Sequence, residues 1–166
     1  MHSTLRREHF GISLKWTATV AAGICVGGYL YITFIETPAR SQLPPKHDAQ
    51  MMQMTHEPTR KIWTPIALLA TTCAFGGFLL TYPSEDDAEW LLADTLLLGT
   101  IPVILCYVWP TGTAIMDSKD TDDVSTERGE NWLACKLNLW SKYHNLRSTF
   151  GAMAFGYMVY LHAKRN

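Results

Sequence analysis

The stretch from Leu139 to Leu161, LWSKYHNLRSTFGAMAFGYMVYL, is apolar enough to cross a membrane, yet it contains three basic side chains. These are Lys142, His144 and Arg147. Ionisable groups inside a membrane-spanning helix cost about 2.5 to 3.5 kcal/mol each on insertion scales, so they normally face the interior of a helix bundle. The stretch therefore predicts a bundle whose interior offers partners for a histidine and an arginine.

The basic residues do not all lie on one side of this predicted helix. At about 100° per residue, Trp140, His144 and Arg147 follow one another at i, i+4 and i+7 and fall within a sector of roughly 60°. Lys142 lies about 200° from Trp140 and close to the end of the span, so we expect its side chain to reach the membrane surface. The inward face is therefore expected to carry Trp140, His144 and Arg147.

The distribution of charge along the chain predicts a membrane protein. Of the 166 residues 48% are hydrophobic, a fraction that also occurs in soluble proteins. The charged residues, however, gather in four segments, and the apolar runs between them are long enough to cross a hydrocarbon core of roughly 30 Å. We predict an all-α fold, a polytopic membrane four-helix bundle formed by residues 1–166 as a single domain. The expected spans are residues 16–35, 63–82, 90–110 and 139–161.

Composition also excludes several kinds of function. The formal net charge of −1 and the lack of a basic stripe exclude nucleic acid as a partner. The four cysteines show no C-x-x-C spacing, and three lie in apolar runs, which disfavours a thiol redox site. No second helical histidine lies within range of His144, so no metal site is expected. We expect a multi-pass integral protein of an endomembrane or the plasma membrane, with membrane lipid around it; the Lys and Arg distribution leaves its orientation open.

Two acidic residues are candidates to meet the basic face. Pro38 disfavours helix at Thr37 and should end the first span, which leaves Glu36 near the membrane boundary and Arg40 in the polar connection. Glu36 is then either a solvated helix end or a carboxylate directed back into the bundle. Asp94 lies about one turn inside the third span. It is either a carboxylate near the membrane interface or a partner of the basic face. Pro102, in the middle of that span, should kink the helix.

His144 and Arg147 together suggest proton abstraction. A neutral histidine in a water-poor cavity can take a proton from a bound substrate, and a neighbouring arginine disfavours the imidazolium and offers several donors to a developing anion. This is the chemistry of enolate or phenolate formation. A purely structural role, in which the pair forms polar contacts between helices, explains the same residues equally well.

The whole chain resembles the anthrone oxygenase family, also called domain of unknown function 1772, a family of small four-span membrane proteins. The last span carries W-x-x-x-H-x-x-R, which is similar to that family's signature. The first span ends in YLYITFIETPAR, residues 29–40, which resembles the family's aromatic-acid-x-Pro-Ala-Arg ending. Pro110-Thr111 resembles its Pro-Thr-Asn turn, although Gly112 stands in place of the asparagine, which puts any substrate contact of that side chain in doubt.

The resemblance implies a reaction and a set of residues. Characterised members of the family oxidise the activated methylene of an anthrone with molecular oxygen, without a tightly bound cofactor. It implies that His144 is the catalytic base and that Arg147 holds the enolate oxygen. It also implies a hydrophobic aromatic small molecule as substrate. The residues expected to bind it are Trp140, Glu36, Asp94, Tyr107 and Thr111.

Two other classes of function remain open. A non-catalytic four-span protein with a structural or partner-binding role would use the same polar face to hold helices together. A small transporter or channel would need a continuous polar path, whereas the second span offers only threonines as polar side chains. Because of this, transport is the least favoured of the three.

Overall fold

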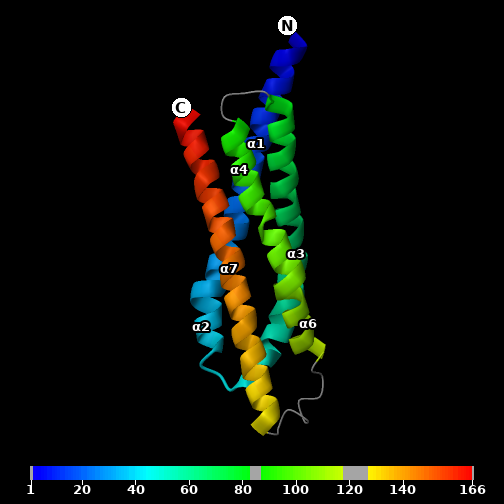
Figure 1. Cartoon of the computed structure of the whole chain (residues 1–166), viewed down its shortest axis with the longest axis vertical. Coiled ribbons are helices and arrows are strands. Elements are labelled where there is room, and N and C mark those ends of the chain that lie inside the picture. The colour runs from blue at the N-terminus through cyan, green and yellow to red at the C-terminus, as the bar shows by residue number, and fades with distance from the viewer. Residues whose placement is uncertain (1, 83–86, 118–126, 166) are drawn as a thin grey trace.

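The structure, a computed structural model, describes residues 2–82, 87–117 and 127–165, and these residues form helices and short connections without any strand. Four long helical stretches run side by side, and the two termini lie at the same end of the bundle (Figure 1). This confirms the predicted all-α membrane bundle. The elements are α1 (His2–Tyr31), the π-helix η1 (Ile32–Glu36), α2 (Thr37–Arg40), α3 (Pro45–Thr81), α4 (Asp87–Leu98), α5 (Thr100–Val103), the π-helix η2 (Ile104–Val108), α6 (Trp109–Asp117) and α7 (Glu127–Arg165).

Three of the helical stretches are long and apolar enough to cross a membrane. Over the described residues these are Leu5–Arg40, Pro45–Thr81 and Ala88–Met116. The chain is therefore a membrane protein. The helix α7 contains the predicted fourth span, residues 139–161, but it is not among the three, because His144, Asn145 and Arg147 lower its hydropathy.

The helices extend well beyond the predicted spans. The clearest case is α3, which begins at Pro45 rather than near residue 63 and continues through Pro58 and Pro65. Its early turns are stabilised by packing rather than by lipid: Ala49 and Met52 are buried in an apolar cluster with Ile115 of α6 and residues of α7. The length of α3 therefore results from packing outside the apolar span as well as from membrane crossing.

The prediction that Pro38 ends the first helical stretch is wrong. The backbone instead passes through the π-helical turn η1, in which the N–H of Thr37 bonds to the carbonyl oxygen of Ile32, five residues earlier. Pro38 then lies in the first turn of α2, where a missing N–H has little cost. The extra turn carries Arg40 back against the bundle.

The third stretch breaks close to the predicted position. The helix α4 ends at Leu98, and the N–H of Gly99 bonds to the carbonyl oxygen of Thr95 at 2.8 Å. The break lies just before Pro102, which cannot donate to the carbonyl of Leu98. The chain then continues through α5 and the π-helical turn η2 into α6.

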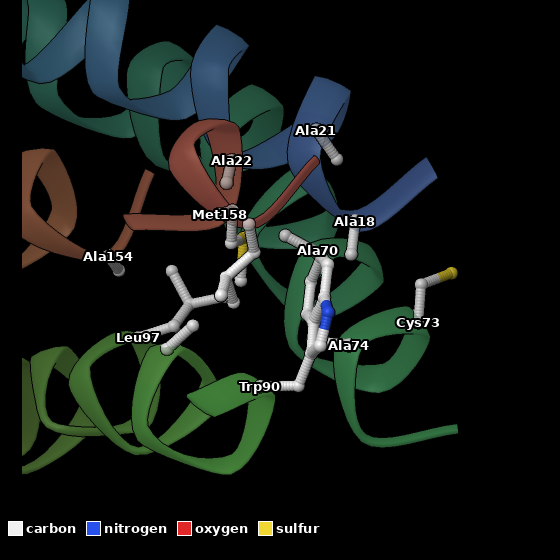
Figure 2. Packing of buried hydrophobic residues seen from close by; sticks show 12 residues of the cluster. Ala18, Ala21, Ala22, Ala70, Cys73, Ala74, Trp90, Leu97, Ala154 and Met158 are labelled. Carbon is white, nitrogen blue, oxygen red and sulfur yellow. The ribbon is translucent and has the colours of Figure 1, made fainter. Parts of the chain in front are cut away.

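Small residues let the helices approach closely near the terminal end. Figure 2 shows the ring of Trp90 reaching from α4 towards Ala70 and Ala74 of α3, with Ala18 of α1 and Met158 of α7 nearby. These side chains belong to one buried cluster, with Trp90 only 1% exposed. A second buried cluster lies towards the other end and includes Trp140. The cavity described next lies between the helices that these clusters hold together.

Candidate active site

A cavity of about 600 Å³ lies inside the bundle, within the size range of small-molecule sites. Its wall is formed by side chains from all four helical stretches. One part is aliphatic and another is polar or aromatic. The polar and aromatic part includes Tyr29, Glu36, Arg40, His56, Arg60, Trp63, Trp140, His144 and Arg147.

The ring of His144 is held in one orientation by the backbone of α1. The side chain is 1% exposed, and its Nε2 lies 3.4 Å from the carbonyl oxygen of Tyr29. Because a carbonyl oxygen only accepts hydrogen bonds, this contact places the proton of a neutral ring on Nε2 and leaves a lone pair on Nδ1. Nδ1 is buried and has no hydrogen-bond partner among the described residues. The histidine is thus arranged to accept a proton at Nδ1.

Arg147 lies against the ring of Tyr29 instead of a carboxylate. Its guanidinium carbon is 4.0 Å from the ring centroid, a close cation–π contact. Within the described part of the chain no ion pair involves Arg147, and its buried Nε has no hydrogen-bond partner there. A cation that lines a cavity without a protein anion is suited to hold a negatively charged or developing oxygen of a ligand.

Trp140 connects His144 to Arg40. Its ring stacks on that of His144 with 5.0 Å between centroids, and the guanidinium carbon of Arg40 lies 5.4 Å from the Trp140 ring. The ring of Tyr29 lies at a steep angle to that of His144, with 6.2 Å between centroids and 82° between the ring planes. The imidazole is therefore in contact with two aromatic rings, one from α7 and one from α1.

Arg40 is buried, contrary to the prediction that it lies in the polar connection. It is 4% exposed, and its guanidinium pairs with Glu36 at 3.3 Å and with Asp48 at 3.4 Å. The π-helical turn η1 explains the difference, because it prolongs the helix as far as Arg40. Glu36 lines the cavity, as one of the two predicted alternatives requires, but its carboxylate is engaged by Arg40 and not by Arg147.

Three predicted binding residues lie away from the cavity wall. Asp94 is buried at 1% exposure, and neither carboxylate oxygen has a hydrogen-bond partner among the described residues. Tyr107 is 47% exposed and stacks on Tyr143 of α7, with 4.6 Å between centroids. Thr111 is buried but does not line the cavity. The structure thus groups Glu36, Trp140, His144 and Arg147, and it does not bring the other three to them.

Several wall residues escaped the sequence argument. Tyr29 lies in the first-span ending, where the sequence gives it no role, whereas His56 lies between the first two predicted spans and Trp63 is the first residue of the second one. Only Arg40 had a signal, because an arginine close to an acid at i−4 can form a helical ion pair. Contacts between helices decide the other three, and one sequence does not contain them. Among the described residues no group of three or more His, Cys, Asp or Glu side chains could hold a metal ion.

Comparison with known proteins assigns the family. The family model described as anthrone oxygenase matches residues 51–157, more than half of the chain. The matched region includes Trp140, His144 and Arg147 of α7. Neither a curated protein nor a solved structure matches the chain. The chain therefore belongs to the anthrone oxygenase family.

Proposed function

We propose that this protein is a multi-pass membrane enzyme that oxidises an activated C–H group of an anthrone-like or phenolic substrate with molecular oxygen. The observation that carries the proposal is the pair formed by His144 and Arg147 in one cavity wall. Nδ1 of His144 and Nε of Arg147 are both buried and lack hydrogen-bond partners among the described residues. Neither atom is therefore committed to another group of the described protein.

The first step is proton transfer from the substrate methylene to Nδ1 of His144. The C–H electron pair moves into the conjugated ring system, and the substrate becomes an enolate or phenolate anion. Arg147 faces the anion with a fixed positive charge, which stabilises the charge as it develops. A base in hydrogen-bond reach of the reacting proton typically accelerates such a step by about 10² to 10⁴.

Oxygen then reacts with the carbanion form of the substrate. The substrate is oxidised and oxygen is reduced: a C–O bond forms, and the resulting peroxide takes the proton back from the imidazolium. Loss of the second methylene proton together with hydroxide, as water, breaks the O–O bond and yields the ketone. The sum is one methylene plus one O₂ giving one carbonyl plus one water. All electrons come from the substrate, so we propose no resident cofactor.

We also propose that α7 is a fourth membrane crossing. The helix is 39 residues long, about 58 Å at 1.5 Å per residue, and packs against α1 and α4 along the bundle. The polar groups that lower its hydropathy include His144 and Arg147, which line the cavity, whereas Lys142 is exposed. Four crossings put both termini on the same side of the membrane, which agrees with their position at the same end of the bundle.

The test uses the full chain in lipid nanodiscs with anthrone as substrate, and it records oxygen uptake and anthraquinone formation. Protein-free nanodiscs correct for spontaneous oxidation. We expect one O₂ per anthraquinone, and a loss of rate of about a hundredfold or more in His144→Gln. Lys142→Ala, on the exposed side of the same helix, is the matched control and should keep the rate. An unchanged rate in His144→Gln would contradict the proposal and favour a structural or partner-binding role.

A further inference from the structure

The exposed members of the cavity wall form two rows that face each other. On α3 they are Glu57, Arg60, Thr64 and Leu68, spaced three or four residues apart. On the other side they are Leu105 of η2 with Trp109 and Thr113 of α6, spaced four apart. Helical spacing puts each row on one face of its helix. The cavity therefore opens sideways, through a slit between α3 and the η2–α6 segment.

The packing of α3 explains why the bundle is open here. Along its length α3 packs against α4 near the terminal end and against α6 near the other end. Between these two contacts the stretch opposite α3, which runs from α4 to α6, is distorted by the break at Gly99, by Pro102 and by the π-helical turn η2. A π-helical turn commonly marks a functional site in an otherwise regular helix.

The slit changes in polarity along its length. Leu68 and Leu105 are 57% and 56% exposed and lie within apolar stretches long enough to cross a membrane. Glu57, Arg60 and Thr113 lie at the opposite, polar end. Exposed leucines in a membrane-spanning segment face hydrocarbon. The apolar end of the slit is therefore open to the lipid core and the polar end to the membrane surface.

One contact crosses the slit near its polar end. The guanidinium carbon of Arg60, on α3, lies 5.4 Å from the ring centroid of Trp109, on α6. Tryptophan and arginine are both suited to the membrane interface, where an aromatic ring and a long cationic side chain each bridge apolar and polar surroundings. A cation–π contact at an exposed site is weak, about 0.5 to 1 kcal/mol, so thermal motion opens it easily.

From this arrangement we propose that the substrate is a planar aromatic molecule dissolved in the bilayer, and that it reaches His144 laterally through the slit, with the Arg60–Trp109 contact as a latch. The proposal rests on the proposed function for the chemistry of the substrate. It adds where the substrate comes from and which side chains control its entry. Entry from lipid also suits an apolar aromatic substrate, because the molecule reaches the cavity without passing through water.

The experiment measures the binding of anthraquinone, a planar probe that lacks the reactive methylene, to the full chain in nanodiscs. Three tryptophans line the cavity, Trp63, Trp109 and Trp140, so the quenching of their combined fluorescence by anthraquinone reports occupancy. The blocked variant is Leu68→Trp with Leu105→Trp. The matched control is Leu69→Trp with Leu98→Trp, because those leucines are 49% and 40% exposed on the same helical stretches but do not line the cavity.

We expect association and dissociation both to slow by about tenfold in the blocked variant, with the affinity unchanged, because a narrowed route raises the barrier in both directions. The control variant should behave like the wild type. Arg60→Ala, which removes the latch, should speed both steps, whereas Lys61→Ala should not. Unfolding of the blocked variant would lower the affinity instead, so the pattern of rates separates a route from structural damage.

Three results would overturn the proposal. One is association in the blocked variant as fast as in the control, which would indicate entry from the aqueous end. Another is loss of affinity with unchanged association, which would make the leucines part of the binding site. The third is no saturable binding of anthraquinone by the wild type. Failure of the proposed function is distinguishable, because it would remove oxygen uptake while the rate pattern of the slit variants remained.

Discussion

The indole ring of Trp140 stacks on the imidazole ring of His144, with 5.0 Å between the centroids and 16° between the ring planes. Both residues lie on α7, four positions apart, so the helix itself brings the rings together. Arg40 of α2 lies 5.4 Å from the ring of Trp140, and Tyr29 of α1 approaches His144 edge-on. The orientation of the proposed base therefore depends on three helical segments.

Removing the ring of Trp140 should impair the proposed reaction, in addition to the stability that a smaller side chain loses in the buried cluster. In Trp140→Leu the imidazole of His144 loses its stacking partner and gains freedom, and small misplacements of a catalytic group cost up to about a hundredfold in rate. We expect the rate of anthrone oxidation to fall by about tenfold or more, with Trp140→Phe keeping most of it. Oxygen uptake at saturating anthrone measures the effect. Equal losses in both variants would argue against a stacking role.

Arg40→Met should destabilise the protein strongly. It leaves Glu36 and Asp48 without their cation. Breaking a buried ion pair by removing one partner typically costs about 3 to 5 kcal/mol, and because Glu36 and Asp48 are 23% and 13% exposed we expect the lower end of that range. Thermal unfolding in detergent should show a clearly lowered midpoint. Lys61→Met is the matched control: its pair with Glu57 is exposed, so the midpoint should not move measurably. Equal midpoints for the two variants would contradict the assignment of Arg40 as a buried anchor.

Gly28→Ala should disturb the cavity from the side of α1. A Cβ at residue 28 would lie 2.5 Å from Cζ2 of Trp63, so the Trp63 ring must move. Overpacking of this kind typically costs about 1 to 3 kcal/mol. We expect a lower unfolding midpoint and weaker anthraquinone binding. Gly27→Ala meets nothing within 4 Å and should change neither quantity, apart from a small gain in helix propensity.

Asp94→Asn should leave the proposed reaction intact, because Asp94 does not line the cavity. The substitution removes a buried carboxylate that has no hydrogen-bond partner among the described residues, which lessens the cost of burial. We therefore expect an unfolding midpoint equal to or above that of the wild type, and a rate of anthrone oxidation within about twofold. A large loss of rate at unchanged stability would indicate instead that Asp94 takes part in the reaction or in substrate binding.

The sequence was sufficient to predict the polar face of α7. The spacing of Trp140, His144 and Arg147 follows from the rotation per residue of any α-helix, and the cost of charge in a membrane turns such a face inward. The same reasoning separated Lys142, which the structure leaves exposed. Helix ends were harder to predict, because hydropathy marks where a chain can lie in lipid and not where its helix ends. Pro38 shows this, since a π-helical turn accommodates it inside a helical stretch.

The sequence by itself determined the all-α membrane fold, the inward face of α7 and the family resemblance, because each depends on local spacing or on the free energy of placing side chains in lipid. Only the tertiary structure decided which groups surround that face. It brought Tyr29, Arg40 and Trp63 to the cavity and placed Asp94 elsewhere, although Tyr29, Trp63 and Asp94 all belong to helices that the sequence reveals. The physical reason is that the relative rotation and depth of packed helices arise from contacts between distant residues, which no local pattern encodes.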